Sequence, residues 1–169
     1  MSTARLFIAL WPDEAVRHEL AARRDAWAFP RSASPVKAER LHVTLHFLGD
    51  VEQSNIPELA DALAVPFEPF ALQIGQHVLW PHGIAVLEPD AAPPPLMHLH
   101  LRLGNALEGC GIAPDARPYR PHVTLARRAG NAQAPPQSPP FSWQVDGYRL
   151  MASTTGPGGG YVTLRAYPD

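Results

Sequence analysis

Apolar and polar side chains alternate along residues 41–48 and again along residues 119–126. An alternation with a period of two is typical of a strand that has one face against a core. Both predicted strands contain the letters His-Val-Thr-Leu, at residues 42–45 and 122–125. We therefore expect each Val and Leu to face the core, and each His to share the opposite face with its own Thr.

Other apolar patterns predict the remaining elements. Residues 5–10 read as a buried strand, and residues 13–27 repeat apolar positions at helical spacing. Ser54 is expected to cap a second helix, and leucines at helical spacing predict a third helix over residues 96–107. Further strands are expected over residues 70–80, 83–87, 141–152 and 161–167, the last two around the glycine-rich residues 156–160.

This order of elements predicts an α+β fold with a mainly antiparallel sheet. The chain also contains a weak internal repeat, since each half has a helix and a strand with the same four-residue sequence. We expect a single domain over residues 1–169, built from two pseudo-symmetric lobes. The helices would lie on the outside, and the two motifs would face each other across a groove between the lobes.

Composition narrows the class of protein. Hydrophobic residues make up 46% of the chain, charged residues make up 18%, and the formal net charge is −2, so a core is expected and tight binding to long nucleic acid is not. Cys110 is the single cysteine and has no partner for a disulfide. The apolar residues 6–11 lack the features of a signal peptide, and no run reaches the roughly 20 apolar residues of a membrane span. A cytoplasmic protein that does not enter a membrane is expected.

The duplicated polar pair suits the opening of a phosphodiester by in-line displacement. One group must deprotonate the attacking water while another protonates the leaving oxygen on the far side of the phosphorus. Histidine can do either, because its pKa near ~6.5 allows both protonation states around neutral pH. Threonine hydroxyls can donate to the phosphate oxygens. Neither copy has the ligand spacing of a strong metal motif, so no metal and no cofactor are expected.

The two copies resemble the paired HxTx motifs of the two-histidine phosphoesterase superfamily. The nearer likeness is to RNA 2′,3′-cyclic phosphodiesterases, historically called 2′-5′ RNA ligases. It covers most of the chain, through residues 5–12, the run 41–49 that ends Phe-Leu-Gly, the Pro-His-Val-Thr-Leu-Ala-Arg segment 121–127, and the strand that follows Gly160. The resemblance implies hydrolysis of an RNA 2′,3′-cyclic phosphate end to a 2′-phosphate.

The resemblance also implies roles for individual residues. His42 would be the proton donor to the leaving 3′ oxygen, and His122 the proton acceptor that activates water. Thr44, Thr124 and Arg127 would bind the substrate phosphate. Strict alternation places Arg127 on the face opposite His122, so its role requires a bend at the end of the strand. The partner would be the RNA 3′ end, and a monomer is expected.

Several other residues admit more than one interpretation. By alternation, His46 shares the face of His42 and either lines the groove or lies on the surface. His98 and His100 belong to a helix and are expected on its solvated face, because positions i and i+2 of a helix diverge. Arg117 and Arg120 are candidates to contact RNA phosphates. Phe47, Trp80, Trp143, His77 or His82 would serve either as a platform for the terminal base or in packing.

Other activities remain open at this stage. The same site would suit a 2′-5′ linked oligonucleotide, a small cyclic nucleotide or an ADP-ribose cyclic phosphate, with reversible 2′-5′ ligation as a side activity. A protein that binds RNA ends without turnover would use the same groove. Because arginine or lysine binds phosphate better than histidine does, the two histidines favour catalysis over binding alone.

Overall fold

The computed structural model describes residues 2–154 and 159–169, so residues 156–158 of the glycine-rich segment lie outside the described part. The strands in these ranges are β1 (Thr3–Leu10), β2 (Ser34–Pro35), β3 (Val43–Glu52), β4 (Phe70–Trp80), β5 (Ile84–Pro89), β6 (Val123–Arg127), β7 (Phe141–Val145), β8 (Tyr148–Ser153) and β9 (Tyr161–Tyr167). The helices are α1 (Glu14–Asp25), α2 (Ile56–Ala62) and α3 (Pro94–Gly109), with the 3-10 turns η1 (Ala38–Arg40) and η2 (Gln53–Asn55).

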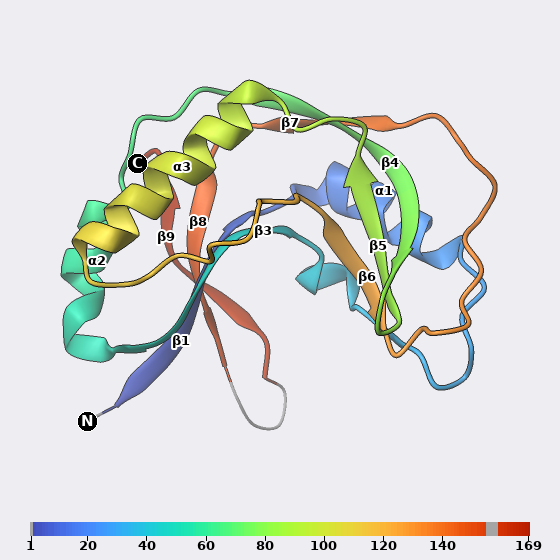
Figure 1. Ribbon diagram of the computed structural model, residues 1–169, viewed down its shortest axis with the longest axis horizontal. Coiled ribbons are helices and arrows are strands. Elements are labelled where there is room, and N and C mark those ends of the chain that lie inside the picture. The colour runs from blue at the N-terminus through green and yellow to red at the C-terminus, as the bar shows by residue number, and fades with distance from the viewer. Residues whose placement is uncertain (1, 155–158) are drawn as a thin grey trace.

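One antiparallel sheet joins these strands in the order β7-β4-β5-β6-β3-β1-β8-β9, with β2 attached to β6. Strands β3 and β6 stand in the middle, and the described pairing between them is the single residue pair Val43 and Val123. The sheet therefore divides there into two lobes, which Figure 1 shows on either side of β3 and β6. The predicted α+β fold with a mainly antiparallel sheet is confirmed.

The two lobes repeat one arrangement. In the first lobe, β3 pairs with β1, β1 with β8, and β8 with β9. In the second lobe, β6 pairs with β5, β5 with β4, and β4 with β7. In each lobe one strand, β1 or β5, leads through a long helix back to a partner strand at the His-Val-Thr-Leu segment. The internal repeat in the sequence thus corresponds to a repeated topology in the fold.

Each long helix contacts the lobe opposite to the strand that precedes it. Helix α1 follows β1, yet Trp27, just beyond its end, donates its indole N–H to Nδ1 of His77 in β4 at 2.7 Å. Helix α3 follows β5, yet the backbone carbonyl of His100 contacts Nε2 of His46 in β3 at 2.8 Å. Figure 1 shows α1 in the same half of the molecule as β4 and β5, and α3 in the same half as α2 and β8. The two crossovers hold the lobes together.

Three predicted elements differ from the structure. Residues 141–152 form two strands in different lobes, because the chain turns at residues 146 and 147 between β7 and β8. Helix α2 begins after η2 and has no side-chain cap, so the predicted Ser54 cap is wrong. The second motif strand begins at Val123 and not at residue 119. Among the described residues, no helix is both long and apolar enough to cross a membrane.

Candidate active site

The pairing of Val43 with Val123 places the two motifs side by side at the junction of the lobes. One step along this antiparallel register sets His42 beside Thr124 and Thr44 beside His122. Both valines are fully buried, so the two His-Thr pairs lie together on the other face of the sheet. The structure thus brings together the four motif residues predicted to do chemistry.

Each imidazole is oriented by the same backbone contact. Nδ1 of His42 lies 2.6 Å from the carbonyl oxygen of Arg40, and Nδ1 of His122 lies 2.9 Å from that of Arg120. A carbonyl oxygen only accepts, so both rings carry a proton on Nδ1 and leave Nε2 to exchange a proton with a ligand. Nε2 of His42 lies 3.0 Å from Oγ1 of Thr44.

His42 is enclosed by aromatic rings. The ring centroids of Phe7 and Trp11 each lie 5.2 Å from the imidazole centroid, Trp11 in a stacked orientation, and the Tyr161 ring meets it edge-on at 5.5 Å. This burial lowers the pKa of His42 to about 4, against the opposing effect of the Arg40 carbonyl. The charges of His122 and Arg127 lower it further. These surroundings therefore keep His42 neutral near pH ~7.

His122 has different neighbours. The Trp80 ring lies 4.2 Å from its imidazole, centroid to centroid, and the guanidinium of Arg120 lies 4.8 Å from the centre of the Trp80 ring. Burial also lowers the pKa of His122, whereas the Arg120 carbonyl and the carboxylate of Glu88 oppose that shift. Glu88 pairs with Arg120 at 2.5 Å. One histidine of the pair thus has a carboxylate nearby, and the other is surrounded by rings.

The bend that Arg127 requires is present as a β-bulge in β6. Val86 pairs with Thr124 and Ala85 with Ala126, so β6 has one more residue than β5 at this point. Leu125 and Ala126 are both buried, and exposed Arg127 follows them. The extra residue reverses the alternation and returns Arg127 to the side of His122. Its positive charge acts on the pKa of both motif histidines.

An equivalent bulge in β3 changes the position of His46. Ile8 pairs with His46 and Ala9 with Thr44, which leaves one extra residue in β3. His46 is only 4% exposed and contacts α3, so alternation along β3 was misleading about its face. Phe47 instead takes the position equivalent to Arg127, and its side chain is 75% exposed. Because of the bulge, the exposed ring of Phe47 lies on the face where alternation predicted His46.

The other candidate residues are distributed as follows. His98 is on the solvated face of α3 as predicted, but His100 is half-buried, because its ring stacks at 4.0 Å on both His46 and Tyr119. Arg117 forms a bidentate pair with Asp115, and Arg120 pairs with Glu88. Both arginines line the groove, but a carboxylate already balances each charge.

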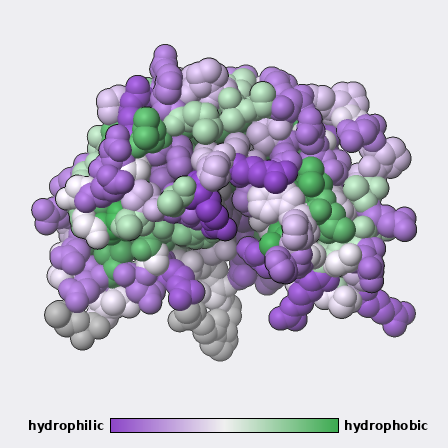
Figure 2. Space-filling model, in the orientation of Figure 1, coloured by the Kyte–Doolittle hydropathy of each residue, from purple (hydrophilic) through white to green (hydrophobic). Residues whose placement is uncertain are grey.

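A groove of about 300 Å³ runs along this junction. Its lining includes Thr44, Phe47, Trp80, Tyr119 and His122. Figure 2 shows a hollow near the middle of the molecule, with hydrophilic side chains at its rim. The predicted pocket between the lobes is therefore present. It exposes aromatic faces next to Thr44 and His122, whereas His42, Thr124 and Arg127 are not among the residues that line it.

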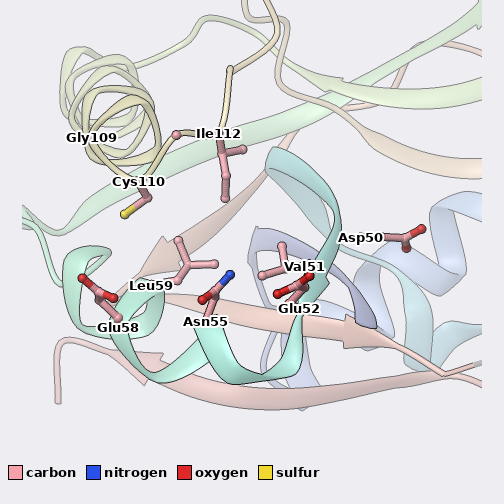
Figure 3. Close-up of a pocket in the computed structure, with 10 residues that line it drawn as sticks. Asp50, Val51, Glu52, Asn55, Glu58, Leu59, Gly109, Cys110 and Ile112 are labelled. Atoms are coloured by element: carbon pink, nitrogen blue, oxygen red, sulfur yellow. The ribbon is translucent and has the colours of Figure 1, made fainter. Parts of the chain in front are cut away.

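A separate cavity lies between η2, α2 and the end of α3 (Figure 3). It is larger, about 520 Å³, but the side chains of Asp50, Glu52 and Glu58 line it. Three carboxylates repel an anion, so this cavity does not suit a phosphate ligand.

Sequence reasoning named Arg120 only as a candidate for RNA contact, and it missed that the backbone carbonyls of Arg40 and Arg120 orient the imidazoles. A signal was present, because the repeat extends two residues upstream: Arg40-Leu41-His42 and Arg120-Pro121-His122. The rings of Trp11 and Tyr161 beside His42 left no comparable signal. They come from opposite ends of the chain, and only the packing of β1 and β9 brings them to the site.

Comparison with known proteins gives consistent results. A family model described as the 2′-5′ RNA ligase superfamily matches residues 11–157. The chain is 31% identical to the RNA 2′,3′-cyclic phosphodiesterase of Escherichia coli, over 89% of this chain and 87% of that protein. It is 29% identical to the protein of the same name from Thermus thermophilus, over 95% and 87%. A crystal structure of E. coli LigT complexed with 3′-AMP superposes with a TM-score of 0.86 at 27% identity, over 98% of both chains.

Proposed function

The chain belongs to the 2′-5′ RNA ligase superfamily, and from this premise we propose that it hydrolyses RNA 2′,3′-cyclic phosphate ends to 2′-phosphates with two histidines and no metal. Relatives that match over most of the chain carry the name RNA 2′,3′-cyclic phosphodiesterase. The observation that carries the proposal is the pairing of Val43 with Val123, which sets the two His-Thr pairs on one face.

The proposed reaction is one in-line displacement. A water molecule attacks the phosphorus while Nε2 of His122 accepts its proton, and the bond from phosphorus to O3′ breaks while Nε2 of His42 donates a proton to that oxygen. The products are a 2′-phosphate monoester and a free 3′ hydroxyl. The matching Nδ1 contacts support these roles, because they leave each Nε2 as the ring atom that exchanges the proton. In the neutral ring, Nε2 of His42 accepts from the Thr44 hydroxyl.

The phosphate would be held by Thr44, Thr124 and Arg127. The two hydroxyls come from opposite lobes and flank the place between the imidazoles. Each can donate to a non-bridging oxygen, and the guanidinium of Arg127 adds a charge-assisted contact. Such donors, fixed before the substrate arrives, favour a transition state in which negative charge is concentrated on those oxygens.

The low pKa of His42 fits this scheme once substrate is present. A general acid must be protonated, whereas burial by the protein alone keeps His42 neutral near pH ~7. A phosphodiester anion beside the ring favours the charged imidazolium and raises its pKa. Substrate binding would therefore recruit the proton that the reaction uses.

One chain contributes both histidines, both threonines and Arg127. We therefore expect residues 1–169 to act as one catalytic unit and a monomer to be fully active, with the RNA 3′ end as its partner.

The test is hydrolysis of an oligonucleotide that ends in a 2′,3′-cyclic phosphate, in the presence of EDTA. We expect opening to a 2′-phosphate product, and a loss of about 10²–10⁴-fold in kcat for His42→Ala and for His122→Ala. His98→Ala is the matched control, since His98 is an exposed histidine on α3. The proposal fails if EDTA abolishes turnover, or if either motif variant keeps the wild-type rate.

The family description favours a second candidate substrate at the same site, a 2′-5′ linked oligonucleotide. The test compares the rates of hydrolysis of 2′-5′ linked dinucleotides, small cyclic nucleotides and the oligonucleotide with a 2′,3′-cyclic phosphate. The fastest of these reactions identifies the preferred substrate. A protein that only binds RNA ends would give saturable binding and no product with any of them.

A further inference from the structure

A basic cleft of about 410 Å³ adjoins the active site on the side of His42. Among the described residues, its lining contains no carboxylate side chain and consists of Lys37, Arg40, Ser153, Thr154, Gly159, Gly160 and Tyr161. Lys37 directly precedes the single turn of η1 and Arg40 ends it, and side chains three residues apart in such a turn project to the same side. The cleft therefore gathers two cations that lie close together.

These two cations differ from the arginines of the main groove. The ion pairs among the described residues occupy Arg117 and Arg120, but they involve neither Lys37 nor Arg40. A guanidinium nitrogen of Arg40 donates to the carbonyl of Gly159, which fixes the group while leaving its charge unbalanced. A fixed cation loses less conformational freedom when it binds an anion.

The cleft is connected directly to His42. The guanidinium of Arg40 lies 5.9 Å from the centre of the Tyr161 ring, and that ring meets the His42 imidazole edge-on at 5.5 Å. The backbone carbonyl of Arg40 also accepts the Nδ1 proton of His42. An anion in the cleft would thus lie one aromatic ring away from the general acid.

The stereochemistry of the substrate determines which part of the RNA reaches this side. In the proposed reaction His42 protonates O3′, so C3′ of the ribose lies next to His42. The chain runs from C3′ through C4′ and C5′ to the phosphodiester that joins the preceding nucleotide. The base leaves from C1′, on the C2′ side of the ring. The next phosphate along the RNA therefore extends past His42, toward Lys37 and Arg40.

We infer that Lys37 and Arg40 bind the phosphodiester between the terminal and the preceding nucleotide. Ser153 adds a hydroxyl donor to the same cleft. The enzyme accordingly favours the end of an RNA chain over a free nucleoside cyclic phosphate. This inference rests on the proposed function, and in particular on His42 as the group that protonates O3′.

The experiment compares kcat/KM for three substrates that carry the same 2′,3′-cyclic phosphate. These are adenosine 2′,3′-cyclic phosphate, the same nucleoside with a 5′-phosphate, and a dinucleotide. We expect the wild type to prefer the two that carry a phosphate at the 5′ position. Lys37→Gln should lower kcat/KM about 3–10-fold for those two and leave the free nucleoside unchanged.

Arg128→Gln is the matched control. Arg128 is an exposed arginine beside Trp80, in an open cleft on the side of His122. We expect this variant to match the wild type on all three substrates. If Arg128→Gln, and not Lys37→Gln, removes the preference for a 5′-phosphate, the RNA leaves past His122 and the inference is overturned.

Two further outcomes separate the inference from its premise. Equal rates on all three substrates, or an equal loss on all three for Lys37→Gln, would overturn the phosphate subsite while leaving the proposed function intact. If the wild type opens none of the three, the proposed function fails and the inference fails with it.

Discussion

At the scale of single residues, the two motif histidines are alike in tautomer and unlike in surroundings. Carbonyl oxygens two residues upstream orient both rings. Three aromatic rings desolvate His42, whereas Glu88 favours the charged form of His122. An acid and a base with identical side chains thus differ through their neighbours, which is the usual way in which proteins separate two equivalent groups.

This difference predicts how the rate depends on pH. The pH profile of kcat/KM reports the free enzyme, in which His42 has a pKa lowered to about 4. Because the acid must be protonated while the base must be neutral, kcat/KM should fall about tenfold per pH unit once the pH exceeds the pKa values of both histidines. The profile of kcat reports the complex, in which the phosphate anion raises the pKa of His42. The alkaline limb of the kcat profile should therefore lie at higher pH than that of kcat/KM. Rates at saturating substrate measure kcat, and rates at subsaturating substrate measure kcat/KM.

Trp11→Leu provides the control for this assignment. Replacing the stacked indole exposes His42 to water, so the alkaline limb of kcat/KM should move to higher pH. Identical limbs for kcat and kcat/KM in the wild type, with no movement in Trp11→Leu, would contradict the account of desolvation.

At the scale of elements, the bulges decide which side chains face the groove. Alternation correctly placed His42, Thr44, His122 and Thr124, because each pair precedes the bulge of its strand. Beyond the bulges it failed, for His46 in one strand and for the face of Arg127 in the other. A bulge depends on the pairing with a neighbouring strand, so the sequence of the bulged strand alone does not reveal it.

The turn between β7 and β8 offers a test at this scale, because it carries the chain from one lobe to the other. A Cβ atom on Gly147 would collide with the backbone carbonyl oxygen of Tyr167. We expect Gly147→Ala to lower the free energy of unfolding by about 2–4 kcal/mol, since a backbone neighbour yields little. Denaturant unfolding followed by circular dichroism measures the change.

Gly109→Ala is the matched control for that substitution. Gly109 ends α3, and a Cβ atom there meets nothing within 4 Å. Alanine also favours a helix more than glycine does, so this variant should be neutral or slightly more stable. A similar loss of stability in both variants would show that the collision at Gly147 is not the cause.

At the scale of the whole molecule, the site belongs to neither lobe alone. Strand β3 brings one His-Thr pair, β6 brings the other, and the two long helices cross between the lobes. A ligand between the pairs should therefore stabilise the fold as a unit. Binding to the folded state alone contributes about 2.7 kcal/mol at a ligand concentration of 100 times Kd.

A nucleoside 2′-monophosphate, the type of product expected, measures this effect. At 100 times its Kd it should raise the Tm of the wild type by about 5–11 °C. Thr44→Val and Thr124→Val each remove one hydroxyl from one lobe, so at the same ligand concentration each should reduce the shift. If only one of the two variants reduces the rise in Tm, a single lobe holds the phosphate.

The sequence by itself determined the α+β class, the long helices and most strands, and the identity of the two His-Thr pairs. These features follow from the local periodicity of apolar residues and from a repeated four-residue sequence. Both signals are contained within short segments of the chain. The family that the resemblance implied could also be recognised from the sequence, because the two motifs and the segments around them resemble those of the family over most of the chain.

The tertiary structure alone decided how those residues meet and what surrounds them. The pairing of Val43 with Val123, the two bulges and the exchanged helices all depend on contacts between segments distant in the sequence. The aromatic enclosure that lowers the pKa of His42 likewise joins β1 with β9. Register, burial and electrostatic environment are properties of the packed chain, and no periodicity within one segment encodes them.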